Sequence, residues 1–362
     1  MIASAAGGVR AVEEKCSMWN AMPTAALAAI FVVSGLMIFV SGLRLTGIVD
    51  KIADRTGLGE ALVGAVLLGA ATSLSGTVVS VTAAVEGRAS LAFSNSVGGI
   101  AAQTVFLAVA DMFYRKTNLE HAAADLANVF QGLVLVVLLA LPFVAFTTPE
   151  FAVFGVHPVS FAIPVVYLFG LSGSRRVRAE PMWEPVETDE TRTDTPDEED
   201  LRAPKVSTPR LFATFGVLMA FMGIAGWAVA ESALAFIDRA GVSESLVGAL
   251  ATAVVTSLPE LVTTVGAVQR GALQLAVGGI IGGNTFDTLF LTLADVFYRP
   301  GSLYHAIGPG DLFWAALGIL MTGILLGGLI LRQKRGPARI GGESMAMVLV
   351  YVIAVVIQAF TA

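Results

Sequence analysis

One half of this chain repeats the other half at a constant offset. When residues 54–121 are placed over the residues 184 positions later, 29 of 68 are identical and no gap is needed. Apolar sequence of low complexity can imitate similarity, but it does not keep D-R-x-G, T-S-L and A-D-x-F-Y-R in one register. The chain therefore contains an internal duplication, and its fold must be built from two copies of one unit.

Both copies consist of long apolar stretches. Hydrophobic residues make up 56% of the chain and charged residues 14%, whereas a soluble domain carries about 25% charged residues. A helix that crosses a membrane needs about 20 apolar residues. We therefore predict an all-α polytopic membrane protein with ten transmembrane helices, five in each repeat. The predicted spans are 23–47, 58–86, 89–114, 123–146, 150–173, 209–236, 242–268, 273–298, 307–331 and 342–361.

An acidic segment lies between the fifth and sixth spans. Residues 174–205 contain ten of the 28 acidic residues, four prolines and few aliphatic residues. Such a segment cannot bury a core, so we expect it to be a disordered linker. The chain is thus predicted to divide into a mobile N-terminal tail, a first five-helix repeat, an acidic linker and a second five-helix repeat, which are 1–22, 23–173, 174–208 and 209–362.

The distribution of lysine and arginine predicts the orientation in the membrane. If the N-terminus is outside, 17 of the 22 basic residues fall on the cytoplasmic side, as the positive-inside rule requires. We expect a multi-pass protein of the cell (inner or plasma) membrane, with both termini outside and the linker 174–208 in the cytoplasm. Because each half has an odd number of spans, the halves form an inverted-topology repeat, which is typical of secondary transporters.

The second half places a carboxylate inside an apolar span, in the stretch T-S-L-P-E-L. An isolated carboxylate such as Glu260 is costly in a membrane unless it is paired, protonated or solvated. Pro259 removes a backbone donor and predicts a helix break, which a membrane tolerates only within protein or beside a watery cavity. Thr256 and Ser257 add hydroxyls one turn away. Hard cations such as Ca²⁺ require oxygen ligands gathered in this way.

The next span carries a second carboxylate, in the stretch G-G-N-T-F-D. Asp287 follows Asn284 by one turn, and the preceding glycines allow a neighbouring helix to approach closely. We expect Asp287 to reach Glu260, and the two carboxylates would neutralise one divalent cation. The competing interpretation is that the buried acids are protonated hydrogen-bond donors that bind no ion.

Two further repeated pairs lie at span ends. Asp111 and Arg115 in the first half correspond to Asp295 and Arg299 in the second. Because each pair is four residues apart, we interpret them as interfacial ion pairs along a helix.

The stretches T-S-L-P-E-L and G-G-N-T-F-D resemble the paired α-repeats of the calcium/cation antiporter superfamily, which includes the sodium/calcium exchangers. In that family, two broken spans from each half cross at the centre and bind the transported cations. The resemblance implies that Thr256, Ser257, Glu260 and Asp287 are ligands. The family serine before the asparagine is Gly283 here, so that hydroxyl is lost.

The first half departs from the family pattern. Thr72 and Ser73 keep the T-S pair, but the family glutamate is Gly76 and the family asparagine or aspartate is Gln103. The resemblance therefore implies a degenerate first repeat without a carboxylate. Thr72, Ser73 and Gln103 are its remaining candidate ligands.

These features predict a secondary active transporter that exchanges Ca²⁺, or a similar cation, for Na⁺ or H⁺ by alternating access. Two alternatives stay open: a Na⁺/H⁺-type exchanger that uses Glu260 and Asp287 as proton carriers, and a non-transporting sensor or scaffold. We expect no enzyme, because no serine stands in a nucleophile motif. We expect no cofactor and no nucleic acid; the partners would be transported inorganic cations and the lipid bilayer, and no oligomer is implied.

Overall fold

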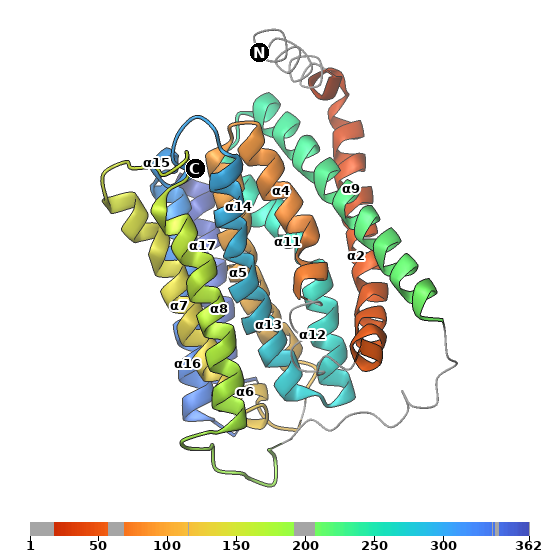
Figure 1. The fold of residues 1–362 in the computed structure, drawn as a ribbon, viewed down its shortest axis with the longest axis vertical. Coiled ribbons are helices and arrows are strands. Elements are labelled where there is room, and N and C mark those ends of the chain that lie inside the picture. Colours follow the sequence, from red (N-terminus) through yellow and green to blue (C-terminus); the bar gives the residue numbers. More distant parts are fainter. Residues whose placement is uncertain are drawn as a thin grey trace.

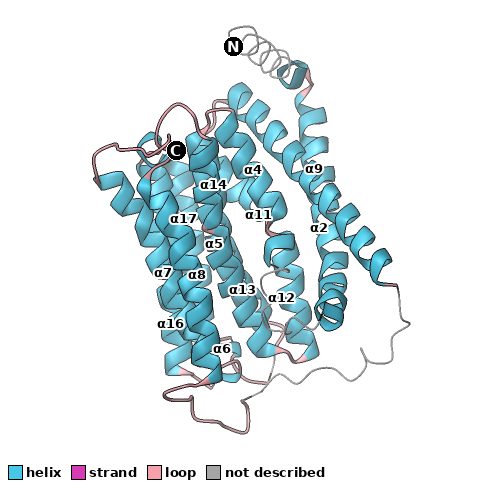
Figure 2. Cartoon of the chain, viewed as in Figure 1, coloured by secondary structure: helices cyan, strands magenta, loops and turns pink. Residues whose placement is uncertain are grey.

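The computed structural model describes residues 18–56, 69–114, 116–191, 207–334, 336 and 340–361. Within these residues the protein is helical almost throughout (Figure 2), and the one extended pairing is an isolated bridge between Val153 and Val156. The predicted all-helical class is confirmed. Parts of the predicted tail, second span and linker lie outside the described residues, namely 1–17, 57–68 and 192–206.

The described helices of the two halves correspond in order, except that α5 in the first half is one helix where the second half has two, α13 and α14. Those of the first half are α2 (Thr24–Thr56), α4 (Leu74–Val85), α5 (Ala89–Asp111), α6 (Leu119–Ala122), α7 (Leu126–Thr147) and α8 (Pro158–Ala179). Those of the second half are α9 (Thr208–Ala240), α10 (Glu244–Leu246), the π-helical segment η2 (Val247–Thr252), α11 (Ala253–Thr256), α12 (Leu258–Arg270), α13 (Leu273–Asp287), α14 (Leu289–Phe297), α15 (Leu303–Ala306), α16 (Pro309–Leu331) and α17 (Gly342–Thr361).

Several of these helices can cross a membrane. Among the described residues, six are long and apolar enough: α2, α5, α7, α9, α16 and α17. The segment from α10 to α12 is a seventh if its bend of 47° falls within one span. Helix is present within each of the ten predicted spans. The number of ten crossings itself stays a prediction.

The two halves run through the bundle in opposite directions. Helix α2 begins and α17 ends at one end of the molecule, whereas α8 ends and α9 begins at the other end (Figure 1). Contacts between the halves occur in matched pairs: α2 packs on α12 as α9 packs on α4, and α7 packs on α13 as α16 packs on α5. Helix α5 is buried along almost its whole length, so its polar residues face protein rather than lipid.

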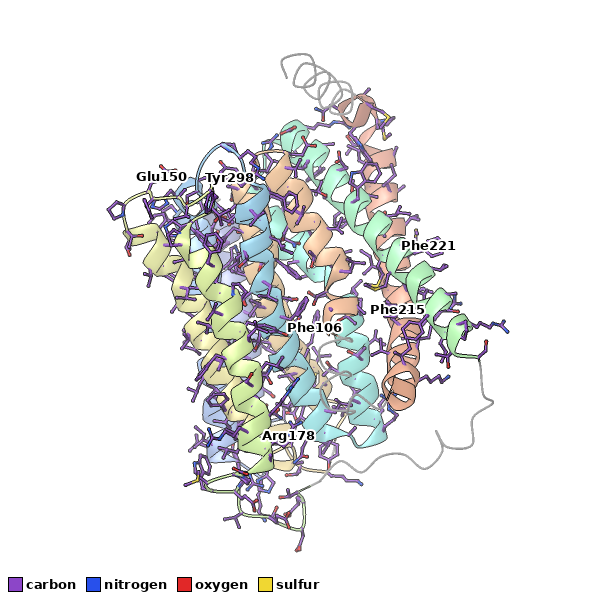
Figure 3. All side chains as sticks on the ribbon, viewed as in Figure 1. Phe106, Glu150, Arg178, Phe215, Phe221 and Tyr298 are labelled. Atoms are coloured by element: carbon purple, nitrogen blue, oxygen red, sulfur yellow. The ribbon has the colours of Figure 1, made fainter. Side chains whose placement is uncertain are left out.

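The flanks of the bundle are apolar and its ends are charged. Exposed apolar side chains occur along α7, α8, α9 and α17. Phe221 lies on the outer flank of α9, while Glu150 and Arg178 lie at opposite ends of the molecule (Figure 3). Apolar flanks between charged ends are the arrangement expected of a helix bundle in a bilayer.

The described parts of the predicted tail and linker contact the bundle. Trp19 is buried and stacks edge-on against Trp227, with ring centroids 5.7 Å apart. In the linker, Thr188 hydrogen-bonds His121, and Glu190 pairs with Lys334. These contacts concern only the described residues of the two segments, and the mobility expected of the tail and the linker stays a prediction.

Candidate cation-binding site at the centre of the bundle

Helix breaks bring side chains from both halves to the centre of the bundle. In the second half the chain leaves helical geometry at Ser257, between α11 and α12, and the two parts meet at an angle of 47°. Pro259 lies in the first turn of α12, where its missing N–H removes no helical hydrogen bond. Ser73 occupies the equivalent position before α4. The break predicted from Pro259 is therefore present, and it has a counterpart in the first half.

The two predicted acids lie together in the protein interior. Glu260 is 5% exposed and Asp287 is 2% exposed, and the two carboxylates act on each other electrostatically. Ser73 Oγ donates to Asp287 Oδ1 at 2.6 Å. The hydroxyls of Thr72 and Ser73 also lie beside the Glu260 carboxylate. The structure thus places both carboxylates of the second half against hydroxyls of the first half.

Gln103 on α5 connects the two acidic helices. Its Nε2 donates to Asp287 Oδ2 at 2.6 Å and to Ser257 Oγ at 3.1 Å. Both oxygens of Asp287 therefore accept a hydrogen bond from the first half. An amide attracts a carboxylate at this position, whereas a second carboxylate would repel it.

Three buried oxygens at this centre accept no hydrogen bond from the described residues. They are Gln103 Oε1, Glu260 Oε2 and Asn284 Oδ1. Gln103 Oε1 faces α13, because a Cβ on Gly283 would lie 3.4 Å from it. A buried acceptor without a partner is costly and points to a water or an ion in the site. Carboxylate and amide oxygens of this kind are ligands that a hard cation accepts.

Two of the predicted ligands border this centre rather than occupy it. Asn284 Nδ2 donates to Thr104 Oγ1 at 3.0 Å, on the α5 side. Thr256 Oγ1 donates to the carbonyl of Thr252 at 2.9 Å. The residues in mutual contact are Thr72, Ser73, Gln103, Ser257, Glu260 and Asp287.

The first-half position equivalent to Glu260 is filled by an aromatic ring. A Cβ on Gly76 would lie 2.9 Å from Phe290 Cε2 and 3.5 Å from Thr256 Oγ1. Phe290 is on α14 and is 3% exposed. The absent carboxylate therefore leaves no polar cavity behind it, because apolar side-chain volume occupies the space.

Several polar residues around the centre were not singled out from the sequence. Ser96 Oγ donates to the Asp287 carbonyl at 2.8 Å. Asn95 Nδ2 donates to the Gly76 carbonyl at 3.1 Å and accepts at Oδ1 from Thr252 Oγ1 at 2.7 Å. The signal for them was the run A-F-S-N-S, residues 92–96, within an otherwise apolar span. Polar side chains at that depth need partners, and here they hold the broken helices against α5.

Comparison with known proteins agrees with the family resemblance seen in the sequence. The family model described as sodium/calcium exchanger protein matches residues 26–171 and 210–360. CaxA of Alkalimonas amylolytica, provisionally assigned as an antiporter, is 27% identical over 312 residues, which cover 84% of this chain and 92% of CaxA. The sodium/calcium exchanger MaX1 of Methanosarcina acetivorans is 39% identical over 69 residues, 19% of this chain and 20% of MaX1.

Two solved structures share the fold. The sodium-calcium exchanger NCX_Mj superposes with a TM-score of 0.57 and 15% identity, over 92% of this chain and 99% of that chain. The H⁺/Ca²⁺ exchanger CAX superposes with a TM-score of 0.64 and 14% identity, over 98% of this chain and 92% of that chain. At these identities the similarity establishes the arrangement of helices.

Proposed function

This chain belongs to the sodium/calcium exchanger family, and on that premise we propose that it exchanges Ca²⁺ for protons across a membrane at the site between Glu260 and Asp287. It is a multi-pass membrane protein of a family of transporters rather than enzymes. We propose that Thr72, Ser73, Gln103, Ser257, Glu260 and Asp287 line the transport site, and that the other two residues singled out from the sequence, Thr256 and Asn284, border it. We expect no cofactor to take part.

The observation that carries the proposal is a buried, doubly acidic centre with unsatisfied oxygens. Two carboxylates supply the charge that balances one divalent cation, and the free oxygens of Gln103, Glu260 and Asn284 are of the type that Ca²⁺ prefers. When no cation is bound, Ser73 and Gln103 donate to Asp287 and reduce the cost of its charge. The first half thus stabilises the charged form of Asp287 before the ion binds.

The choice of protons as the counter-ion follows from the ligand oxygens that both halves lack; Gly99 is the first-half counterpart of Gly283. Phe290 fills the space beside Gly76, and Gly99 and Gly283 carry no hydroxyl. Na⁺ needs several oxygen ligands for each ion, whereas a proton needs only the carboxylate that it neutralises. Two protons on Glu260 and Asp287 therefore replace one Ca²⁺ with no additional ligand.

We further propose that the site is exposed alternately by movement of α2 and α9 against the broken helices. The two contacts are equivalent in the repeats: Gly42 on α2 lies against Pro259, and Gly226 on α9 lies against Ser75. Each glycine therefore touches the residue that precedes the acid position of the opposite half. A glycine contact lets two helices lie close without interlocking side chains, which suits a sliding surface.

The orientation and the division of the chain belong to the same proposal. The basic residues support both termini outside the cell membrane and the acidic linker in the cytoplasm. The opposed directions of the two halves support ten crossings as two inverted repeats of five.

The experiment is Ca²⁺ flux into proteoliposomes that contain the full chain. We expect a proton gradient to drive Ca²⁺ uptake, and an equal Na⁺ or K⁺ gradient at fixed pH to drive none. Uptake driven by Na⁺ alone would overturn the choice of protons. Uptake driven by no gradient, with the protein shown to be folded, would overturn antiport.

A further inference from the structure

Two aspartates at equivalent positions fasten the halves to each other, away from the central site. Asp111 ends α5 and Asp295 lies near the end of α14, and both are fully buried. Each accepts the N–H of the first residue of the short helix that follows: Leu119 at 2.8 Å and Leu303 at 2.9 Å. The same aspartates also reach the last long helix of the opposite half.

This arrangement replaces the interfacial ion pairs predicted from the sequence. Asp295 accepts from the backbone N–H of His157 and from Ser160 Oγ, both at 2.7 Å, so it caps α8 instead of pairing with Arg299. The predicted pairing was wrong here because the helix ends before Arg299 and the aspartate turns inward. For Asp111 the predicted partner, Arg115, lies outside the described residues.

We call each of the two aspartates, together with the side chains around it, an anchor. At the Asp295 anchor, each hydrogen-bond donor has its own acceptor. Ser160 Oγ donates to Asp295, and Tyr304 on α15 meets Ser160 through its hydroxyl at 2.9 Å. Tyrosine is neutral and its hydroxyl can donate or accept, so the cluster of Asp295, Ser160 and Tyr304 carries one negative charge.

The equivalent anchor at Asp111 differs by one residue. Asp111 Oδ2 accepts from the N–H of Gly341 at 2.8 Å, just before α17, but Glu120 stands where the other anchor has Tyr304. Ser344 donates to Glu120 Oε1 at 2.8 Å and also lies beside Asp111. One hydroxyl proton cannot serve two carboxylates. The Asp111 anchor therefore lacks one donor that the Asp295 anchor possesses.

The Glu120 oxygen that lacks a hydrogen-bond partner lies on the side of Asp111. Glu120 is 1% exposed, and its Oε2 accepts no hydrogen bond from the described residues. A Cβ on Gly341 would lie 3.0 Å from Glu120 Oε2 and 3.5 Å from Asp111 Oδ2, so the two carboxylates converge on one point. Two buried acids that converge without a cation share a proton in many proteins.

Among the described residues, which leave out Arg115, Arg335 and Arg339, no group beside Glu120 supplies a compensating positive charge. The strongest charged neighbours of Glu120 are Asp111 on α5 and Glu343 on α17, both acidic. Helices α13 and α16, which pack on α6, have no titratable residue at this end. The described basic residues nearby are engaged elsewhere or exposed: Arg332 donates to the carbonyls of Val186 and His121, His121 bonds the Arg332 carbonyl and Thr188, Lys334 pairs with Glu190, and Lys116 is exposed.

We propose that Asp111 and Glu120 bind one proton between them, and that this proton fastens α6 of the first half to the start of α17 in the second half. The proton supplies the donor that Tyr304 supplies at the other anchor. The proposal concerns a second ionisable site and does not depend on which ions the central site transports.

The direction of the pH response follows from linkage. Burial, and then the charge of Asp111, raise the pKa of Glu120 to about 7. A glutamate whose pKa is raised on folding binds more protons in the folded state than in the unfolded state. The contact between α6 and the start of α17 is therefore most stable at low pH. It weakens as the pH rises from about 4.5, the pKa of Glu120 in the unfolded chain, through about 7, its pKa in the folded protein.

The test compares the unaltered full chain with Glu120→Gln, which keeps a donor at any pH, and with Glu120→Tyr, which copies the other anchor. Amide exchange of 119–123 and 341–347 is measured in lipid nanodiscs from about pH 5.5 to about pH 8.5, after correction for the intrinsic rate. We expect the unaltered chain to lose about 30-fold protection over this range, because about 1.5 pH units separate its lower end from the pKa of about 7 and each unit is tenfold. In both variants the protection should not change with pH. The control Glu187→Gln, which alters an exposed carboxylate, should lose protection as the unaltered chain does.

Infrared difference spectra supply a second readout. The carboxylic-acid band should bleach near neutral pH, and the part of it assigned to this site should be missing in Glu120→Gln. Flat protection in the unaltered chain, or an unchanged acid band in Glu120→Gln, would overturn the proposal. A titration that shifts when Na⁺ or Ca²⁺ is added, and shifts equally in Glu260→Gln, would show that a metal cation rather than a proton occupies this site.

Discussion

Residues 76 and 260 occupy equivalent places in the repeat, yet one is a glycine covered by Phe290 and the other is a buried glutamate. The next helix shows the same contrast, with Gln103 in the first half and Asp287 in the second. The backbone plan is shared: breaks at Ser73 and Ser257 precede both acid positions. The halves therefore agree in geometry and differ in charge.

At the candidate site, the two halves contribute different chemical groups. The second half supplies the acceptors Glu260 and Asp287, and the first half supplies the donors Ser73 and Gln103. Because both halves meet at one centre, loss of the acid from one half removes charge without removing the site. In the proposed transport cycle, a fully symmetric centre would hold more negative charge and would need more cations to neutralise it.

The largest effect should follow from neutralising Glu260, one of the two acids that the second half places at the centre. Glu260→Gln keeps the shape of the side chain and removes one of the two negative charges. Contacts to a charged group contribute about 1.5–3 kcal/mol, so we expect Ca²⁺ flux to fall by about 100-fold. Flux and the Ca²⁺-dependent rise in melting temperature are the measurements, and both should be lost together.

A matched control separates charge at the site from charge elsewhere. Glu187→Gln removes the same group from an exposed loop position and should leave flux and melting unchanged. If Glu260→Gln transported Ca²⁺ as well as the unaltered protein does, the contrast between the halves would have no functional meaning.

The second effect comes from placing an acid in the first half, at the position equivalent to Glu260. Gly76→Glu places a side chain where Phe290 lies 2.9 Å away, and it adds a third buried carboxylate. An unpaired buried charge costs several kcal/mol, so this variant should melt well below the unaltered protein. Gly76→Glu combined with Phe290→Ala gives the new carboxylate room, and Ca²⁺ should then stabilise the protein more than it does without the changes.

A double-mutant cycle decides whether the ring and the missing acid are linked. Phe290→Ala alone should cost about 3–5 kcal/mol, as expected for a buried aromatic residue. The double variant should be less destabilised in Ca²⁺ than the sum of the two single variants. Strict additivity would show that Phe290 does not occupy the space of the lost acid.

Sequence reasoning identified the acids and the helix break because each violates a strong rule. A proline and a glutamate within an apolar span have few tolerable environments, so Pro259 and Glu260 were sufficient to predict a break beside a polar centre. The role of Phe290 could not be predicted, since a phenylalanine in an apolar span violates no rule. Only the packing of α14 on α4 shows that it fills the position of a missing side chain.

The anchors at the span ends were misinterpreted for a related reason. Spacing of four residues indicates an ion pair only if the helix continues through both residues. The helix ends before Arg299, and Asp295 instead caps α15, eight residues further on, and α8 in the other half of the chain. Such contacts depend on tertiary structure, and a local pattern carries no information about them.

A smaller effect should show where the halves remain equal. Gly42→Ala and Gly226→Ala each add a methyl group to the equivalent contacts with Pro259 and Ser75. Overpacking costs about 1–3 kcal/mol, and both variants should slow Ca²⁺ flux by similar factors while Ca²⁺ binding is retained. Gly216→Ala on α9, where a Cβ would meet nothing within 4 Å, is the control. A strong effect of one substitution without the other would show that the asymmetry extends beyond the charged centre.

The smallest effect concerns an ion pair between the two halves that has no counterpart in the repeat. Arg88, between α4 and α5, pairs with Asp238 and with Glu244 Oε1, the latter at 2.8 Å, and its counterpart 184 residues later is Ala272. About a third of the Arg88 side chain is exposed, so water and salt screen the pair. Arg88→Ala should lower the free energy of unfolding by about 0.2–1 kcal/mol, and the difference should shrink as salt is added. Thermal melts at two ionic strengths measure this, with flux unchanged. A loss well above this range, or one that salt does not reduce, would mean that charge outside the centre also distinguishes the halves, and the contrast between Gly76 and Glu260 would no longer stand alone.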